Sequence, residues 1–117
     1  MEPERALTDL VEISPQIEAA LVFDDGGAVA GAVGVASGRE PLLAGAAREL
    51  VQAAGEFRHG ASRVTQLRAS LGASDVFVVG GASGERGMVA VTSGRPAPGL
   101  VFYDLKRCLG ALEQGEG

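Results

Sequence analysis

The feature that most constrains the fold is a segment from Glu40 to about Arg58 that has the apolar periodicity of an α-helix. Pro41 suits its first turn. At about 100° per residue, its apolar side chains sweep an arc of roughly 200°, about twice the width that packing on one sheet requires. The arc consists of Leu42, Leu43, Ala44, Ala46, Ala47, Leu50, Val51, Ala53, Ala54 and Phe57.

The excess width predicts a second packing partner for this helix, and its alanines would let another helix approach closely. Arg48, Glu49, Gln52 and Glu56 occupy the remaining polar side. The alternative is that alanine tolerates solvent and the buried stripe is narrower, because single exposed apolar residues are common on protein surfaces.

A β-hairpin is expected before this helix. Residues from Ile17 to Phe23 alternate with a period of two, which indicates a strand. Asp24-Asp25-Gly26-Gly27 is typical of a turn, and we interpret its aspartates as turn formers rather than cation ligands. The second strand is expected near Ala28–Val35, but its glycine-rich sequence, GAVAGAVGV, leaves its pairing register open.

Three more strands are expected at 64–71, 75–80 and 88–92. The second of them contains Val76–Val79, which is apolar on both faces, so helices should lie on both sides of the sheet. One helix begins near Pro3 and is stopped by Pro15, and the last begins near Gly99.

The sequence therefore predicts one α/β (α+β) domain over residues 1–117, in the order helix, two strands, helix, three strands, helix. Its core is expected from about residue 5 to 113, with a flexible tail at 114–117. The formal net charge of −5 and the absence of tryptophan argue against nucleic-acid binding. No apolar run is long enough for a membrane span and the amino terminus is acidic, so a cytoplasmic protein is expected.

Residues with catalytic or metal-binding chemistry are sparse. His59 is the only histidine, and we interpret it as a solvated residue near a helix end. Cys108 is the only cysteine, interpreted as a small buried hydrophobe. The glycine-rich segment Gly80–Gly87 lacks the lysine of a P-loop and is expected to be a hairpin loop, with Arg86 at its tip as a solvated residue or, less favoured, an arginine finger. We therefore predict no enzymatic activity, no metal and no cofactor.

Two segments resemble a known family. LTDLVEISPQIEAALVFDDGGAVAG is similar to the opening of Roadblock-type domains, the dynein light chain roadblock family, and APGLVFYDLKRCLGAL is similar to that family's last helix. The resemblance extends over about Leu7 to Leu112. It implies a five-stranded antiparallel sheet with helices on both faces, in the Roadblock or profilin-like architecture.

The resemblance also implies a homodimer, in which the middle helices pair and the third strands join two sheets into one. Members act as non-catalytic regulators or adaptors, in bacteria typically alongside small Ras-like GTPases, which some of them activate. The interface residues so implied are Leu43, Ala46, Ala47, Leu50, Val51 and Ala54 on the helix, Arg39, Arg48, Glu49 and Gln52 at its rim, and Val64, Gln66 and Arg68 on the third strand.

A different class of function stays open on the sequence alone. A small-molecule sensor of the PAS or GAF kind also combines a sheet with flanking helices, and its apolar interior would hold a ligand. The few aromatic residues, 4% of the chain, and the lack of evident polar anchors favour the interaction module.

Overall fold

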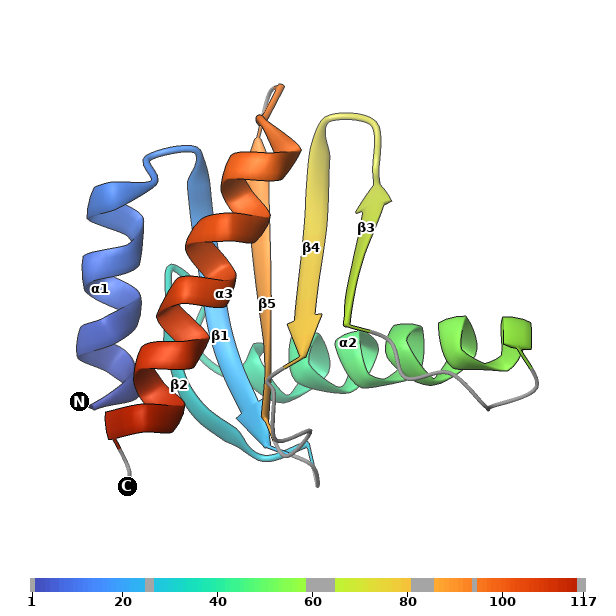
Figure 1. Ribbon diagram of the computed structural model, residues 1–117, viewed down its shortest axis with the longest axis horizontal. Coiled ribbons are helices and arrows are strands. Elements are labelled where there is room, and N and C mark those ends of the chain that lie inside the picture. The colour runs from blue at the N-terminus through green and yellow to red at the C-terminus, as the bar shows by residue number, and fades with distance from the viewer. Residues whose placement is uncertain (1, 25–26, 59–64, 81–85, 94, 116–117) are drawn as a thin grey trace.

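The computed structural model describes residues 2–24, 27–58, 65–80, 86–93 and 95–115, which form a five-stranded antiparallel sheet with helices on both faces (Figure 1). The strand order across the sheet is β2-β1-β5-β4-β3, so β2 and β3 are its edges. The predicted fold class and element order are confirmed. The elements are α1 (Pro3–Ile13), β1 (Ile17–Asp24), β2 (Val29–Val33), α2 (Glu40–Gly55) with a 3₁₀ turn (Glu56–Arg58), β3 (Gln66–Ser70), β4 (Ser74–Gly80), β5 (Arg86–Ser93) and α3 (Pro98–Gly115).

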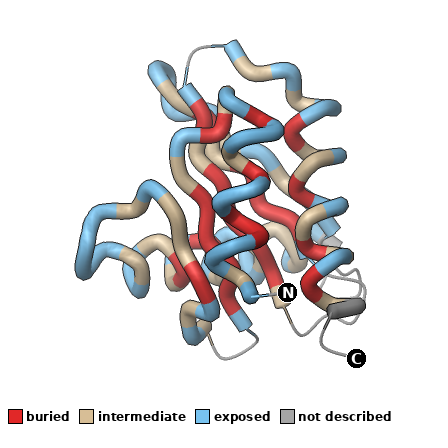
Figure 2. The backbone as a smooth tube through the Cα atoms, turned by 90° about the vertical axis from the view of Figure 1, so that its left-hand side faces the viewer, coloured by how far each residue is buried: buried red, intermediate tan, exposed pale blue. Residues whose placement is uncertain are grey.

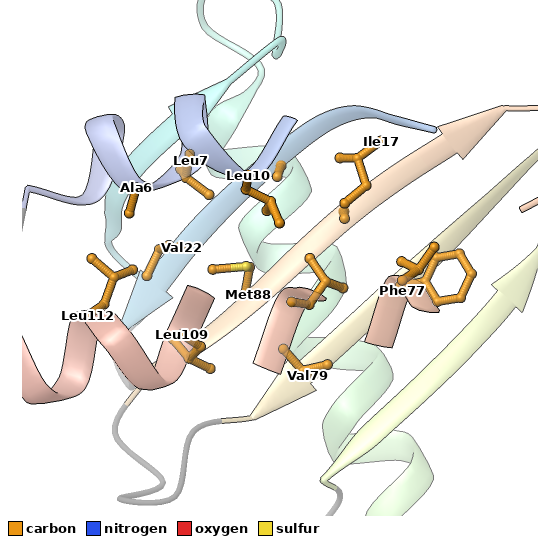
Figure 3. Packing of buried hydrophobic residues seen from close by; sticks show 14 residues of the cluster. Ala6, Leu7, Leu10, Ile17, Val22, Phe77, Val79, Met88, Leu109 and Leu112 are labelled. Atoms are coloured by element: carbon orange, nitrogen blue, oxygen red, sulfur yellow. The ribbon is translucent and has the colours of Figure 1, made fainter. Parts of the chain in front are cut away.

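The first cluster of buried side chains lies between the sheet and helices α1 and α3 (Figure 3). Its strand residues include Val22, Phe77 and Met88, and each of these side chains is fully enclosed. Phe77 meets Phe102 of α3 edge-to-face, with ring centroids 5.1 Å apart. Burial of this many apolar side chains is the main force that holds α1 and α3 on the sheet.

The second cluster lies on the other face, beneath α2. It joins Leu21, Phe23, Val78 and Val89 of the strands to Ala44 and Ala47 of the helix. Buried residues therefore follow the central strands on both of their faces, while the outer turns of the helices are exposed (Figure 2). This confirms that the apolar run in β4 is covered from both sides.

The β1–β2 hairpin forms as expected from its turn residues. The backbone N–H of Ala28 donates to Asp24 Oδ1 over 2.9 Å, so this aspartate is a turn former, as predicted. Asp25 lies outside the described residues.

The register that the sequence left open is set by a bulge in the hairpin. Val22 pairs with Gly31, but Phe23 pairs with Val29, which leaves Ala30 as the extra residue. Gly31 is required because α1 passes directly over it: a Cβ there would lie 2.8 Å from Pro3 Cβ.

Several boundaries differ from those predicted. β2 is shorter at both ends than expected; at its carboxyl-terminal end Gly34 has a φ of +72° and takes the chain out of the strand. Ile17 joins the α1/α3 cluster rather than the face of Leu21, because the β1–β5 register shifts between Ile17 and Ala19.

The position of Arg86 and the end of the last helix also differ from those predicted. Arg86 is the first residue of β5 and pairs with Asp24, so it is not a loop-tip residue. Helix α3 continues to Gly115, so half of the expected tail at 114–117 is helical. Within the described residues, none of the helices combines the length and apolar character that crossing a bilayer requires.

Candidate protein-interaction surface

The wide apolar arc of α2 divides into two flanks. The inner flank packs against strands β1, β2 and β5. Ala44 and Ala47 are fully buried there, and Leu43 and Val51 are partly buried in the same cluster. Ala47, predicted as an interface residue, therefore contacts the chain's own sheet.

The outer flank of the same helix stays exposed. Its five side chains follow one another at intervals of three or four residues, so they form one continuous apolar row along the helix. We call this row the outer stripe. Phe57 is 86% exposed, Leu42 67% and Leu50 40%. The outer stripe consists of Leu42, Ala46, Leu50 and Ala53 of α2 together with Phe57 of the 3₁₀ turn that follows it.

The edge strand β3 presents a second open surface. α2 crosses the direction of the strands, and its carboxyl-terminal end projects beyond β3 in Figure 1. Leu67 of β3 packs at the border of the α2-side cluster and is only partly buried, as is Ala69. Among the described strands β3 pairs with β4 alone, so its outer hydrogen-bonding groups face away from the sheet.

Arg68, also predicted as an interface residue, lies on the opposite face of β3. Its Nε donates to Asp75 Oδ2 over 2.6 Å, and its guanidinium lies 5.6 Å from the centre of the Phe77 ring. Asp75 is 4% exposed and also accepts from Ser70 Oγ. Gln66 shares this face by the alternation of the strand. The structure thus separates Gln66 and Arg68 from the outer stripe.

The predicted rim residues are divided as well. Arg39, Glu49 and Gln52 are exposed. Arg48 is partly buried and packs on the β1–β2 turn, where a Cβ at Gly27 would lie 3.0 Å from Arg48 Cδ. Val64 lies outside the described residues.

The remaining predicted residues lie on or between the two flanks. Ala46 and Leu50 belong to the exposed outer stripe, whereas Leu43, Val51 and Ala54 are of intermediate exposure. The predicted interface residues come from the centre of the arc, so they do not include Leu42, Ala53 and Phe57 of the exposed outer stripe. They also do not include Leu67 and Ala69, which the alternation of polar and apolar residues in QLRAS places on one face of β3.

Chemistry outside this surface is limited in the part of the chain that the structure describes. It holds no group of three His, Cys, Asp or Glu side chains that could bind a metal ion. Cys108 is half-buried, and its thiol donates to the Ala6 carbonyl with 3.7 Å between sulfur and oxygen. Burial, and then the nearby Asp9 carboxylate, raise the pKa of this thiol to about 11, so it is protonated at neutral pH. His59 is not among the described residues.

Comparison with known proteins identifies the fold but not a close relative. Neither a protein-family model nor a curated protein sequence matches the chain. A solved Roadblock/LC7 domain from Streptomyces avermitilis has a TM-score of 0.84 at 19% identity, with 97% of each chain covered. An MglB structure with a tetrameric arrangement has a TM-score of 0.70 at 22% identity and covers 97% of this chain and 88% of that one.

The same arrangement of strands and helices extends to a more distant protein. Profilin II of Acanthamoeba castellanii has a TM-score of 0.61 at 13% identity, covering 97% of this chain and 98% of that one. The chain therefore has the Roadblock/LC7 fold, within the wider profilin-like architecture.

Proposed function

We propose that this chain is a non-catalytic homodimeric regulator of a small Ras-like GTPase. The observation that carries the proposal is the outer stripe, whose large side chains Leu42, Leu50 and Phe57 stay exposed. The carboxyl-terminal end of α2 projects beyond the open edge of β3 (Figure 1). A contiguous apolar surface of this kind on a small domain marks a protein-interaction site. The resemblance of the sequence to Roadblock domains supplies the class of partner.

A second copy of the chain fits both open surfaces at once. Pairing β3 with the same strand of a second copy would satisfy the outer backbone groups of both strands. A two-fold axis at that junction would bring α2 of each copy beneath the join, with Leu50 and Leu67 covered. The neighbouring MglB structure in a tetrameric arrangement supports self-association on this fold.

The paired α2 helices would form the platform for the GTPase. The exposed charged residues Arg39 and Glu49 border the outer stripe and would set orientation and selectivity. The dimer acts either by activating the GTPase, through positioning of the partner's own catalytic residues, or as a scaffold. These two roles make different predictions about GTP hydrolysis.

The dimer is tested with two variants of α2 that add the same charge. We expect Leu50→Glu to make the protein monomeric, because association would desolvate an unpaired carboxylate. Gln52→Glu lies on the polar side of the same helix and should remain dimeric. Sedimentation velocity measures the assembly, and circular dichroism verifies that both variants are folded. A wild-type chain that sediments as a monomer at micromolar concentration would refute the homodimer.

The GTPase role is tested with the small Ras-like GTPase encoded nearest to this gene. In single-turnover GTP hydrolysis, an activator should raise the rate by 10³-fold or more, on the order of the effect of GTPase-activating proteins. A scaffold should bind the GTPase in a pull-down without changing the rate. Leu50→Glu should abolish either effect. The regulator proposal fails if the wild-type protein neither binds that GTPase nor alters its hydrolysis rate.

Native mass spectrometry of the purified protein distinguishes the GTPase regulator from the small-molecule sensor. A sensor should retain a small molecule, whereas the regulator should show only the mass of two chains. In the described residues both faces of the sheet are filled by clusters of packed side chains, which favours the regulator.

A further inference from the structure

The second edge of the sheet, β2, borders a hollow that the proposed dimer leaves open. This hollow has a volume of about 430 Å³. Residues 27–32 line it, together with Glu4 of α1 and with Glu40 and Pro41 of α2. Because α1 and α2 lie on opposite faces of the sheet, the hollow follows the edge of β2 between the first turns of two helices.

The β2 edge carries no side-chain protection against strand addition, although the bulge at Ala30 interrupts its regular ladder. Exposed edge strands commonly carry lysine, proline or an inward-pointing charge, but β2 has the sequence VAGAV. In the described part of the chain β2 pairs with β1 alone, so its outer backbone groups are not used by the sheet. The side chains that line the hollow from the strand are small, which leaves space for the side chains of an added strand.

The charged residues that line the hollow indicate which kind of segment can bind beside β2. Among the described residues that line this hollow, Glu4 and Glu40 carry charge, one from each flanking helix, while Arg39 and Arg48 lie outside its lining. Two copies of this edge brought together would place four carboxylates near one another, so the charges disfavour a second copy of the chain. They favour a segment that carries positive charge.

We propose that the β2 edge binds an extended, basic segment of a partner protein, which adds to the sheet as a further strand between Glu4 and Glu40. Side chains of an added strand alternate between the two faces. Two adjacent basic residues would therefore point to opposite faces, one toward Glu4 and the other toward Glu40. This site does not depend on the proposed dimer, which uses the opposite edge.

The probe is a fluorescein-labelled peptide of about eight residues, the usual upper range of a strand, which alternates threonine and valine and has two adjacent arginines at its centre. Fluorescence anisotropy at low ionic strength measures its binding to the wild-type protein. Two further peptides carry N-methyl groups on alternate backbone amides. In one of them these amides lie along one edge of the extended peptide, and in the other they lie along the opposite edge. Strand addition predicts that at least one of them binds at least tenfold more weakly, because N-methylation removes the backbone donor. Equal binding of all three peptides would overturn the proposal.

Matched variants test the role of the two carboxylates. Glu4→Gln and Glu40→Gln should each raise the dissociation constant about threefold, as for exposed ion pairs. Glutamine at position 40 keeps an acceptor for the Gly38 N–H, which donates to Glu40 Oε2 over 3.1 Å. Glu12→Gln removes the same charge from an exposed position of α1 outside the hollow and should leave binding unchanged. An equal loss in all three variants would indicate attraction to net charge alone and refute the site.

Nuclear magnetic resonance locates the bound peptide. Amide resonances of Val29–Val33 should shift on titration with the arginine peptide, while those of Gln66–Ser70 should not. Shifts confined to Gln66–Ser70 would place the peptide on the other edge and overturn the assignment to β2.

Discussion

Gly34 and Gly38 show how backbone conformation constrains single residues in this chain. Both have positive φ angles, +72° and +86° respectively. A Cβ at Gly34 would lie 2.3 Å from the carbonyl oxygen of Glu18, whereas a Cβ at Gly38 would meet nothing within 4 Å. The two positions therefore separate the cost of the backbone conformation from the cost of a steric clash.

Alanine at each position measures these two costs. We expect Gly38→Ala to lower the free energy of unfolding by about 1 kcal/mol, because left-handed backbone is unfavourable for an L-residue. Gly34→Ala should lower it by about 3 kcal/mol, because β1 must also shift away from the new methyl group. Urea denaturation followed by circular dichroism measures both values. Equal losses in the two variants would show that the clash is relieved without cost.

At the scale of the element, β3 is held to the sheet by few contacts besides its ladder with β4. Arg68 connects the two strands through its ion pair with the buried Asp75, and it also lies against the Phe77 ring. Removal of the guanidinium would leave a buried carboxylate that still accepts a hydrogen bond from Ser70 Oγ. The interaction therefore stabilises the strand that the proposed dimer uses.

The variant Arg68→Met tests this connection, since methionine keeps the apolar contact with Phe77 but loses the charge. We expect a loss of about 2 kcal/mol in the free energy of unfolding, less than for a fully buried pair because Arg68 is partly exposed. The double variant Arg68→Met with Asp75→Asn should recover part of this loss, because no unpaired charge remains. A single variant as stable as the wild type would contradict the role given to Arg68.

Local patterns in the sequence predicted several of these strands and turns correctly. The period of two in Ile17–Phe23, the aspartate turn at Asp24 and the apolar run Val76–Val79 each depend on local geometry, and the structure contains all three elements. The register of the β1–β2 pair and its bulge at Ala30 were not predictable in the same way, because they depend on the close passage of α1 over Gly31.

At the scale of the whole molecule, the proposed dimer makes stability depend on concentration. Association and folding are linked, so a dimer gains stability by mass action. We expect the melting temperature to rise by about 3 °C for each tenfold increase in protein concentration. The monomeric Leu50→Glu variant should show no such rise in differential scanning calorimetry. A melting temperature of the wild type that does not change with concentration would argue against a folding-linked dimer.

The helices and strands of this protein and their order follow from local patterns in the sequence. Periodicity, turn residues and helix-starting prolines act over a few residues, so they can be identified along the chain. The excess width of the apolar arc on α2 was also visible there, and Leu42, Leu50 and Phe57 remain exposed in the structure.

The packing of the elements sets three further features: which flank of that arc the sheet covers, on which face of β3 Arg68 lies, and the position of Glu4 and Glu40 at the same hollow. A pattern along the chain shows which side chains share a face. It does not show which faces meet, because residues far apart in sequence are brought together by the packing of whole elements.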